Sequence, residues 1–206
     1  MTSPRPLRLA VLGDSLAYGT GAVRRDEALG PRLAAALTAA GHAVDLRILA
    51  VPGATSAELG PQVRRAAALV PDVAVVVIGA NDLARLVPPA RAARALGAAV
   101  AGLPGTDVVV ATAPDMSVAP VVPARFRPLV RTGCAALAAL QAREVEAAGG
   151  TVARLGAELA APFRADPALF SADRYHPSGA GYALIAARLT PLVLAAADAR
   201  RERGAA

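Results

Sequence analysis

The chain has 206 residues, of which 55% are hydrophobic and 18% charged, so it is long enough for one folded domain and too apolar for a disordered chain. Its single cysteine, Cys134, excludes an intrachain disulfide framework and a cysteine-rich zinc site. The net charge is +6, but the 22 basic residues are all arginine, scattered in ones and twos, and only 3% of residues are aromatic, so we expect no nucleic-acid partner.

Short runs rich in β-branched residues alternate along the chain with longer runs of alanine, leucine and arginine. The short runs predict strands at Leu7–Leu12, Ala43–Val51, Val73–Ile78, Asp107–Ala111 and Thr151–Leu155. The longer runs predict helices at Glu27–Ala40, Ser56–Val70, Ala90–Gly102, Ala135–Ala148 and Ser178–Arg200, the last one bent at Pro191. One proline-rich stretch, Ala113–Pro128, predicts a long loop, either a wall over a functional site or a surface connection.

This alternation predicts right-handed βαβ units, a parallel sheet and a three-layer α/β/α sandwich. No repeat or linker interrupts it, so we expect a single domain over residues 1–206, with a mobile tail from about residue 200. The beginning of the chain lacks the apolar run of about 7–15 residues of a secretory signal. No apolar run reaches the roughly 20 residues of a membrane span. These features favour a cytoplasmic protein without stable membrane association.

Ligands of a parallel α/β sheet bind where the strands end, which directs attention to the residues that follow each predicted strand. Ser15, just after the first strand, suits a nucleophile, but a hydroxyl needs a base to take its proton. Of the two histidines, His42 falls in a helix-to-strand turn at the opposite edge, which leaves His176 as the expected base. Asp173, three residues earlier, is spaced to orient the imidazole.

Acyl transfer also needs hydrogen-bond donors for the oxyanion of the tetrahedral intermediate. The expected donors are the backbone N–H groups of Ser15 and Gly53 and the side-chain amide of Asn81, the only asparagine in the chain. Asp14 is expected to stabilise the turn or cap the helix that follows it. Asp82 is expected to bond loop amides or Arg85.

Four sequence blocks carry these residues: Gly13-Asp14-Ser15-Leu16, Gly53, Gly79-Ala80-Asn81-Asp82 and Asp173-Arg174-Tyr175-His176. In order and spacing they resemble the four blocks of the SGNH hydrolases, also known as GDSL esterases and lipases. The second block retains Gly53 but departs from the family pattern around it. The resemblance implies a flavodoxin-like sheet with strand order 2-1-3-4-5 and ester hydrolysis without a metal. It implies the same roles for Ser15, His176, Asp173, Gly53 and Asn81.

The sequence therefore predicts a serine hydrolase that cleaves small-molecule carboxylic esters through an acyl-enzyme, with no cofactor. One alternative is an acyltransferase that uses the same site. Another is a non-catalytic flavodoxin-like binding module, although the chain lacks both Gly-x-Gly-x-x-Gly and Gly-Lys-Ser/Thr. The acyl group, the alcohol, the role of loop 113–128 and the oligomeric state stay open at this stage.

Overall fold

A computed structural model of the chain describes residues 5–205, with side chains through Arg203. One sheet of parallel strands has the order β2-β1-β3-β4-β5. The strands are β1 (Leu7–Gly13), β2 (Val44–Ile48), β3 (Val73–Val77), β4 (Asp107–Ala111) and β5 (Thr151–Ala153). The predicted fold class and strand order are confirmed.

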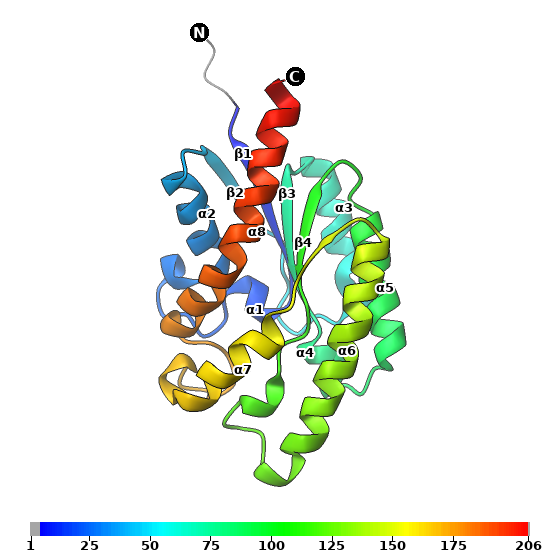
Figure 1. Cartoon of the computed structure of the whole chain (residues 1–206), viewed down its shortest axis with the longest axis vertical. Helices are drawn as coiled ribbons and strands as arrows, with labels where there is room; N and C mark the ends of the chain where they lie inside the picture. Colours follow the sequence, from blue (N-terminus) through cyan, green and yellow to red (C-terminus); the bar gives the residue numbers. More distant parts are fainter. Residues whose placement is uncertain (1–4, 206) are drawn as a thin grey trace.

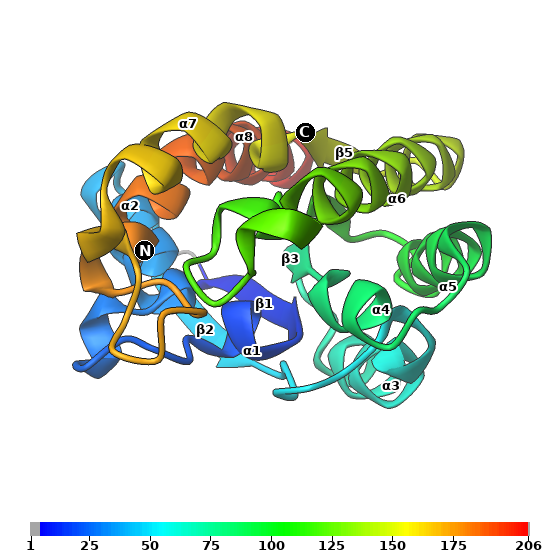
Figure 2. The same ribbon diagram turned by 90° about the horizontal axis from the view of Figure 1, so that it is seen from below.

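The longer helices are α2 (Leu29–Ala39), α3 (Gly60–Leu69), α5 (Pro89–Ala101), α6 (Arg127–Ala147), α7 (Leu155–Ala165) and α8 (Gly179–Ala205). Two short helices, α1 (Ser15–Tyr18) and α4 (Ala80–Ala84), follow β1 and β3 directly. Single 3-10 turns occur at Arg25–Glu27, Ser56–Leu59, Met116–Val118, Ala124–Phe126 and Pro167–Leu169. Seen from below in Figure 2, α1, α4 and the loops around them gather at the carboxyl edge of the sheet.

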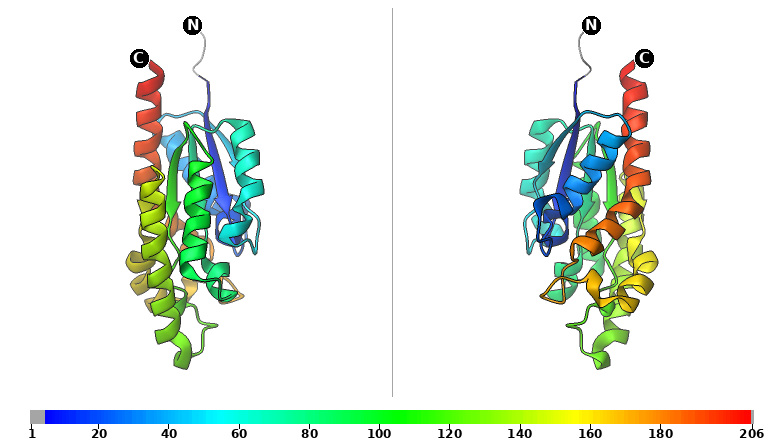
Figure 3. Two further views of the ribbon diagram at one scale, coloured as in Figure 1. Left: turned by 90° about the vertical axis from the view of Figure 1, so that its right-hand side faces the viewer. Right: turned by 90° about the vertical axis from the view of Figure 1, so that its left-hand side faces the viewer.

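The helices lie on both faces of the sheet, with α2, α7 and α8 on one side and α3 and α5 on the other (Figures 1 and 3). Alternate residues of each central strand enter different cores: Leu9 and Val11 join one buried cluster, and Ala10 and Leu12 join the other. β3 is buried at every position, which explains why its sequence is apolar without alternation. A sheet covered on both faces leaves its carboxyl edge as the place where loops meet solvent.

Helix boundaries differ from the prediction in the second half of the chain. The helix predicted to start at Ala135 begins at Arg127. Pro128 is tolerated because it lies in the first turn, where backbone N–H groups have no acceptor within the helix. The strand predicted to reach Leu155 ends at Ala153, since Leu155 opens α7, a helix that the sequence pattern did not predict.

The last helix, α8, runs on through Pro191 and into the segment predicted to be a mobile tail. Residues 200–205 of that segment are helical, while Ala206 lies outside the described residues. Arg200 donates to the Asp72 carboxylate and Arg203 pairs with Asp107, so the end of the helix is held at the amino edge. Within residues 5–205, α8 is the one helix long and apolar enough to cross a membrane, but it packs against β3 and β4.

Candidate active site

The end of β1 is shaped so that Ser15 points out from the carboxyl edge. Gly13 has a φ of +133°, and a Cβ there would lie 1.8 Å from the carbonyl oxygen of Val77, so only glycine fits. Asp14 caps α1 by accepting the backbone N–H of Leu16 at 3.0 Å. Ser15 is then the first residue of α1, directly above the strand.

His176 comes from a tight turn between Phe170 and Pro177, which form an isolated antiparallel bridge. Within the turn, the N–H of Ser171 donates to the His176 carbonyl at 2.8 Å, and Arg174 adopts a left-handed φ of 60°. Asp173 Oδ1 accepts three hydrogen bonds from the turn itself, from the Ser171 hydroxyl and from the N–H groups of residues 175 and 176. The carboxylate thereby fixes the turn that carries the histidine.

Ser15, His176 and Asp173 form a continuous hydrogen-bonded chain. His176 Nε2 lies 3.0 Å from Ser15 Oγ, and His176 Nδ1 lies 2.6 Å from Asp173 Oδ2. Desolvation raises the pKa of Asp173, but hydrogen bonds from His176 and Ser171 outweigh it and hold the pKa well below its usual range. A charged Asp173 places the imidazole proton on Nδ1 and leaves Nε2 free to accept from the serine hydroxyl.

The loop after α1 supports the histidine from behind. Tyr182, fully buried in α8, donates its hydroxyl to the Thr20 carbonyl at 2.7 Å. Gly21 has a φ of +97°, and a Cβ there would lie 2.5 Å from the Pro177 carbonyl oxygen and 2.9 Å from His176 Cβ. The position of the imidazole therefore depends on close contact between two loops.

Side chains at α4 hold the loop that follows β2. The Asn81 amide donates to the Ala54 carbonyl at 3.1 Å, and Asp82 accepts both the N–H and the hydroxyl of Ser56. Arg85 donates to the Gly53 carbonyl at 2.7 Å. Asp82 thus bonds a loop amide, as predicted, while Arg85 binds the loop backbone separately.

The same edge presents two backbone donors without a protein acceptor. Across residues 5–205, the N–H groups of Ser15 and Gly53 make no hydrogen bond. The Asn81 amide reaches Asp14 Oδ2 only at 3.4 Å, near the limit for a hydrogen bond. These three donors come from the ends of three adjacent strands, so the geometry offers a site for a developing negative charge.

Asp14 is a second carboxyl at this edge, and it is 2% exposed. Burial raises its pKa to about 6. The neighbouring Asp82 carboxylate also raises this pKa, whereas the hydrogen bond from the Leu16 N–H lowers it. Its protonation therefore changes close to neutral pH, unlike that of Asp173.

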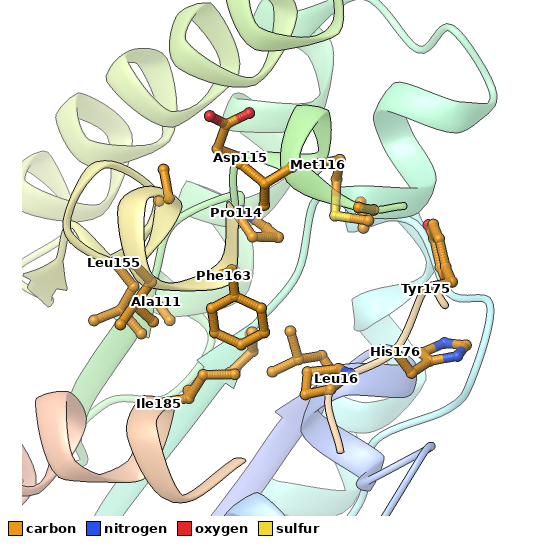
Figure 4. A pocket seen from close by; sticks show the side chains of 18 of the residues that line it. Leu16, Ala111, Pro114, Asp115, Met116, Leu155, Phe163, Tyr175, His176 and Ile185 are labelled. Atoms are coloured by element: carbon orange, nitrogen blue, oxygen red, sulfur yellow. The ribbon is translucent and has the colours of Figure 1, made fainter. Parts of the chain in front are cut away.

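A cavity of about 80 Å³ extends from Ser15 and His176 into the molecule. Figure 4 shows Phe163, Ile185, Leu155 and Leu16 around it, with Tyr175 and His176 at one side. The part of its lining that comes from β3, β4, α7 and the loop after β4 is apolar except for Thr112 and Asp115. Met116 and Val118 belong to this lining, so the first part of the predicted loop 113–128 is a wall of the cavity.

The sequence also matches a family model. Residues 11–184 match the GDSL-like lipase/acylhydrolase family, a span that includes all four blocks of the site. The chain belongs to this family. A curated member, the GDSL-like esterase Rv1075c of Mycobacterium tuberculosis, is 40% identical over 206 residues. That alignment covers 97% of this chain and 65% of the relative, so the chain spans about two thirds of its length.

Solved structures show the same fold at lower identity. An α/β hydrolase, LAE5, from the metagenome of Lake Arreo in Spain superposes with a TM-score of 0.71 and 22% identity, covering 92% of this chain and 94% of its own. A lipase/acylhydrolase from Enterococcus faecalis gives a TM-score of 0.71 and 21% identity, covering 92% of this chain and 96% of its own.

The structure places the predicted residues of this GDSL-like chain together at one edge: Ser15, Gly53, Asn81, Asp173 and His176. The other histidine, His42, is buried at the opposite edge with its Nε2 3.1 Å from Asp198 Oδ1. Cys134 is buried in α6, and burial raises the pKa of its thiol, so it stays protonated, as expected for an inert cysteine.

Two buried glutamines outside the set of predicted site residues stabilise this edge. Gln62 bonds both the N–H and the carbonyl of Gly13, at 2.8 and 2.9 Å. Gln141 accepts the N–H of Ala113 at 2.7 Å and donates to the Ile78 carbonyl at 3.1 Å. A signal was available for Gln141, which stands four residues from both Leu137 and Val145 on the buried side of α6.

Proposed function

We propose that this protein is a serine hydrolase that cleaves carboxylic esters through an acyl-enzyme. The observation that carries the proposal is the hydrogen-bonded chain in which His176 lies 3.0 Å from the Ser15 hydroxyl and 2.6 Å from Asp173. Membership of the GDSL-like lipase/acylhydrolase family supports ester hydrolysis as the reaction. The geometry supports the assignment of a catalytic triad.

In the proposed mechanism, Ser15 Oγ attacks the acyl carbonyl while His176 Nε2 takes its proton. Asp173 stabilises the imidazolium that forms and keeps its orientation. Collapse of the tetrahedral intermediate expels the alcohol, which receives the proton from His176. Water then attacks the acyl-enzyme, with His176 again as base, and releases the carboxylic acid.

We assign the oxyanion hole to the N–H groups of Ser15 and Gly53 and the side-chain amide of Asn81. The two backbone groups have no other acceptor among the described residues, so they lose no bond when the oxyanion forms. The bond to the Ala54 carbonyl fixes the Asn81 amide, and its second hydrogen, which meets Asp14 only at 3.4 Å, is the donor assigned to the oxyanion. Losing one such donor raises the barrier by about 3–4 kcal/mol.

The apolar cavity beside Ser15 is assigned to the acyl group of the ester. A cavity that holds one water measures about 10–15 Å³, and this one measures about 80 Å³. That room suits an acyl chain of several carbons, and it favours linear chains over sugar-like acyl groups. The alcohol half of the ester would lie toward solvent, outside this cavity.

Replacement of Ser15 by alanine tests the function with a series of nitrophenyl esters of increasing acyl length. We expect kcat to fall by about 10⁴–10⁶-fold, the loss known for a missing serine nucleophile. The parent enzyme should acylate at Ser15, detectable by intact mass after rapid quenching. Unchanged hydrolysis in Ser15→Ala contradicts the assignment, and an absence of hydrolysis in the parent protein favours a non-catalytic binding module.

A further inference from the structure

The loop after β4 continues from the cavity wall into a protruding segment that we call the tip, residues 120–130. Figures 1 and 3 show this segment and the start of α6 as the part of the molecule that reaches farthest below the sheet. The tip sequence is PVVPARFRPLV, which contains proline, apolar residues and two arginines, and no uncharged polar or acidic residue. That composition is unusual for a surface loop.

Three large apolar side chains of the tip are exposed to solvent. Leu129 is 73% exposed, Val121 is 47% exposed and Phe126 is 45% exposed. These are three of the nine exposed large hydrophobic residues among the described part of the chain, and they fall within nine residues of one another. Isolated exposed leucines need no explanation, but such a concentration marks an interaction site.

The charged residues along the tip and the start of α6 are all arginines, and the bordering carboxylate, Asp115, pairs with Arg131 at 3.9 Å. From Met116 to Arg143 the chain has four arginines and no aspartate or glutamate. Arg125 lies over the Phe126 ring with its guanidinium 4.8 Å from the ring centre, and Arg127 donates to the Val122 carbonyl. Among the described residues, neither forms an ion pair with a carboxylate. Their charges are therefore available to an external anion.

We propose that the tip docks this protein reversibly on an anionic lipid bilayer. Exposed aromatic and aliphatic side chains enter the headgroup region while neighbouring arginines meet lipid phosphates, which is the chemistry of interfacial attachment. The like charge of two tips disfavours pairing with a second copy through the same surface. The tip also projects outward from the sheet (Figures 1 and 3), which suits contact with an extended surface. This refines the expectation of no stable membrane association, which rested on the absence of an apolar run long enough to span a membrane.

Docking of the tip would bring the cavity close to the lipid surface. Met116 and Val118, just before the tip, line the same cavity as His176. An acyl chain that leaves the bilayer beside the tip would reach the cavity with little exposure to water. The docking itself does not depend on the proposed ester hydrolysis, so the two are tested separately.

Vesicle flotation with the full chain tests the proposal. Vesicles of phosphatidylglycerol and phosphatidylcholine are compared with phosphatidylcholine alone, at low salt and at high salt. The test variant is Phe126→Asp/Leu129→Asp, and the matched control is Val23→Asp/Val70→Asp, which adds the same charge at residues 94% and 56% exposed elsewhere. Hydrolysis of a soluble short-chain ester reports folding and the proposed function independently of binding.

We expect the parent protein to bind the phosphatidylglycerol vesicles in a salt-dependent manner, the tip variant to lose at least about tenfold in partitioning, and the control to stay within about twofold. If the double variant fails to fold, Arg125→Gln should still weaken partitioning by about fivefold, the value of one cation near an anionic surface. Three results would overturn the proposal: no binding by the parent protein, equal losses in the control, or a parent dimer that the tip substitutions dissociate.

Discussion

At residue 21 two loops touch behind the imidazole, and a side chain has no room there. Gly21 and Gly41 have similar positive φ angles, +97° and +90°, but a Cβ at residue 41 would meet nothing within 4 Å. We expect Gly41→Ala to lower the free energy of unfolding by about 1–2 kcal/mol through backbone strain alone. Gly21→Ala should carry that strain and also displace His176, lowering kcat/KM by about 10²-fold. Equal activity of the two variants in an ester assay contradicts this view of the loop.

Asp14 makes a pH-dependent contribution to stability that can be separated from its capping bond. Its pKa is about 6 in the folded chain, above its ordinary value of 3.8, so the folded state binds more protons than the unfolded state between these values. The carboxyl therefore favours folding at low pH, and this contribution is lost as the pH rises through 6. Asp14→Asn keeps an acceptor for Leu16 without the charge. Its stability relative to the parent should rise by roughly 2–3 kcal/mol between pH 4 and pH 8.

Urea unfolding at several pH values measures that difference. Asp166→Asn is the matched control, because Asp166 caps a short turn through the same kind of bond, to Ala168 N–H at 2.9 Å, on an exposed carboxylate. The control should vary with pH by clearly less than the Asp14 variant. If the stability difference between Asp14→Asn and the parent does not change with pH, the inferred burial of a charge at this position is contradicted.

At the scale of elements, the sequence predicts strands better than helix boundaries. Five strands and their order follow from short β-branched runs and the family blocks, although the predicted Ala43–Val51 is observed only as Val44–Ile48. Leu49 and Val51 still donate their N–H groups to the Val11 and Gly13 carbonyls of β1, at 2.8 and 3.0 Å, and the chain then turns into the loop that α4 holds. Pro128 and Gly133 lie inside α6, and Pro162 lies inside α7. Because proline and glycine usually mark helix ends, the sequence does not predict the start of α6 or the presence of α7.

The site residues that the sequence predicts are those with reactive side chains or a motif. Ser15, Asn81, Asp173 and His176 fall in blocks directly after strands or before the last helix, so topology alone places them at one edge. Gln62 and Gln141 act by bonding backbone from helices far along the chain. Only packing reveals such partners, because a glutamine on a helix has no sequence pattern that names its acceptor.

Because α7 forms one wall of the cavity, it should set the acyl-chain preference. Phe163 from this helix is 8% exposed and meets Phe170 edge to face, with ring centres 5.1 Å apart. Phe163→Leu should enlarge the cavity and raise kcat/KM for longer acyl chains relative to shorter ones by about tenfold or more, the range for one or two methylenes. Phe126→Leu is the control, since Phe126 lies in the tip. A chain-length series that is unchanged in Phe163→Leu would place the acyl group elsewhere.

At the scale of the whole molecule, one carboxylate joins the two ends of the described chain at the amino edge of the sheet. Asp72, 2% exposed, accepts two hydrogen bonds from Arg5, at 3.0 and 2.7 Å, and one from the N–H of Arg8 at 2.9 Å. Arg200 from the end of α8 adds a bond at 3.2 Å. Desolvation raises the pKa of Asp72, but the bonds from Arg5 and Arg8 hold it below its ordinary value. Its stabilisation is therefore present above the unfolded pKa and is lost as the pH falls through the folded value.

This junction lies at the opposite edge of the sheet from Ser15, so its loss should affect stability without affecting chemistry. Asp72→Asn should lower the free energy of unfolding at pH 7 by about 2–3 kcal/mol, because a charge-assisted set of bonds is weakened while its arginine partners stay partly hydrated. The matched control is Asp45→Asn, whose carboxylate pairs with Arg47 at the surface of β2 and should change stability by less than about 1 kcal/mol. Ester hydrolysis at a temperature where all three proteins are folded should be equal. If Asp72→Asn unfolds like Asp45→Asn, the junction does not hold the two ends, and if its activity falls while it remains folded, the amino edge is coupled to the active site.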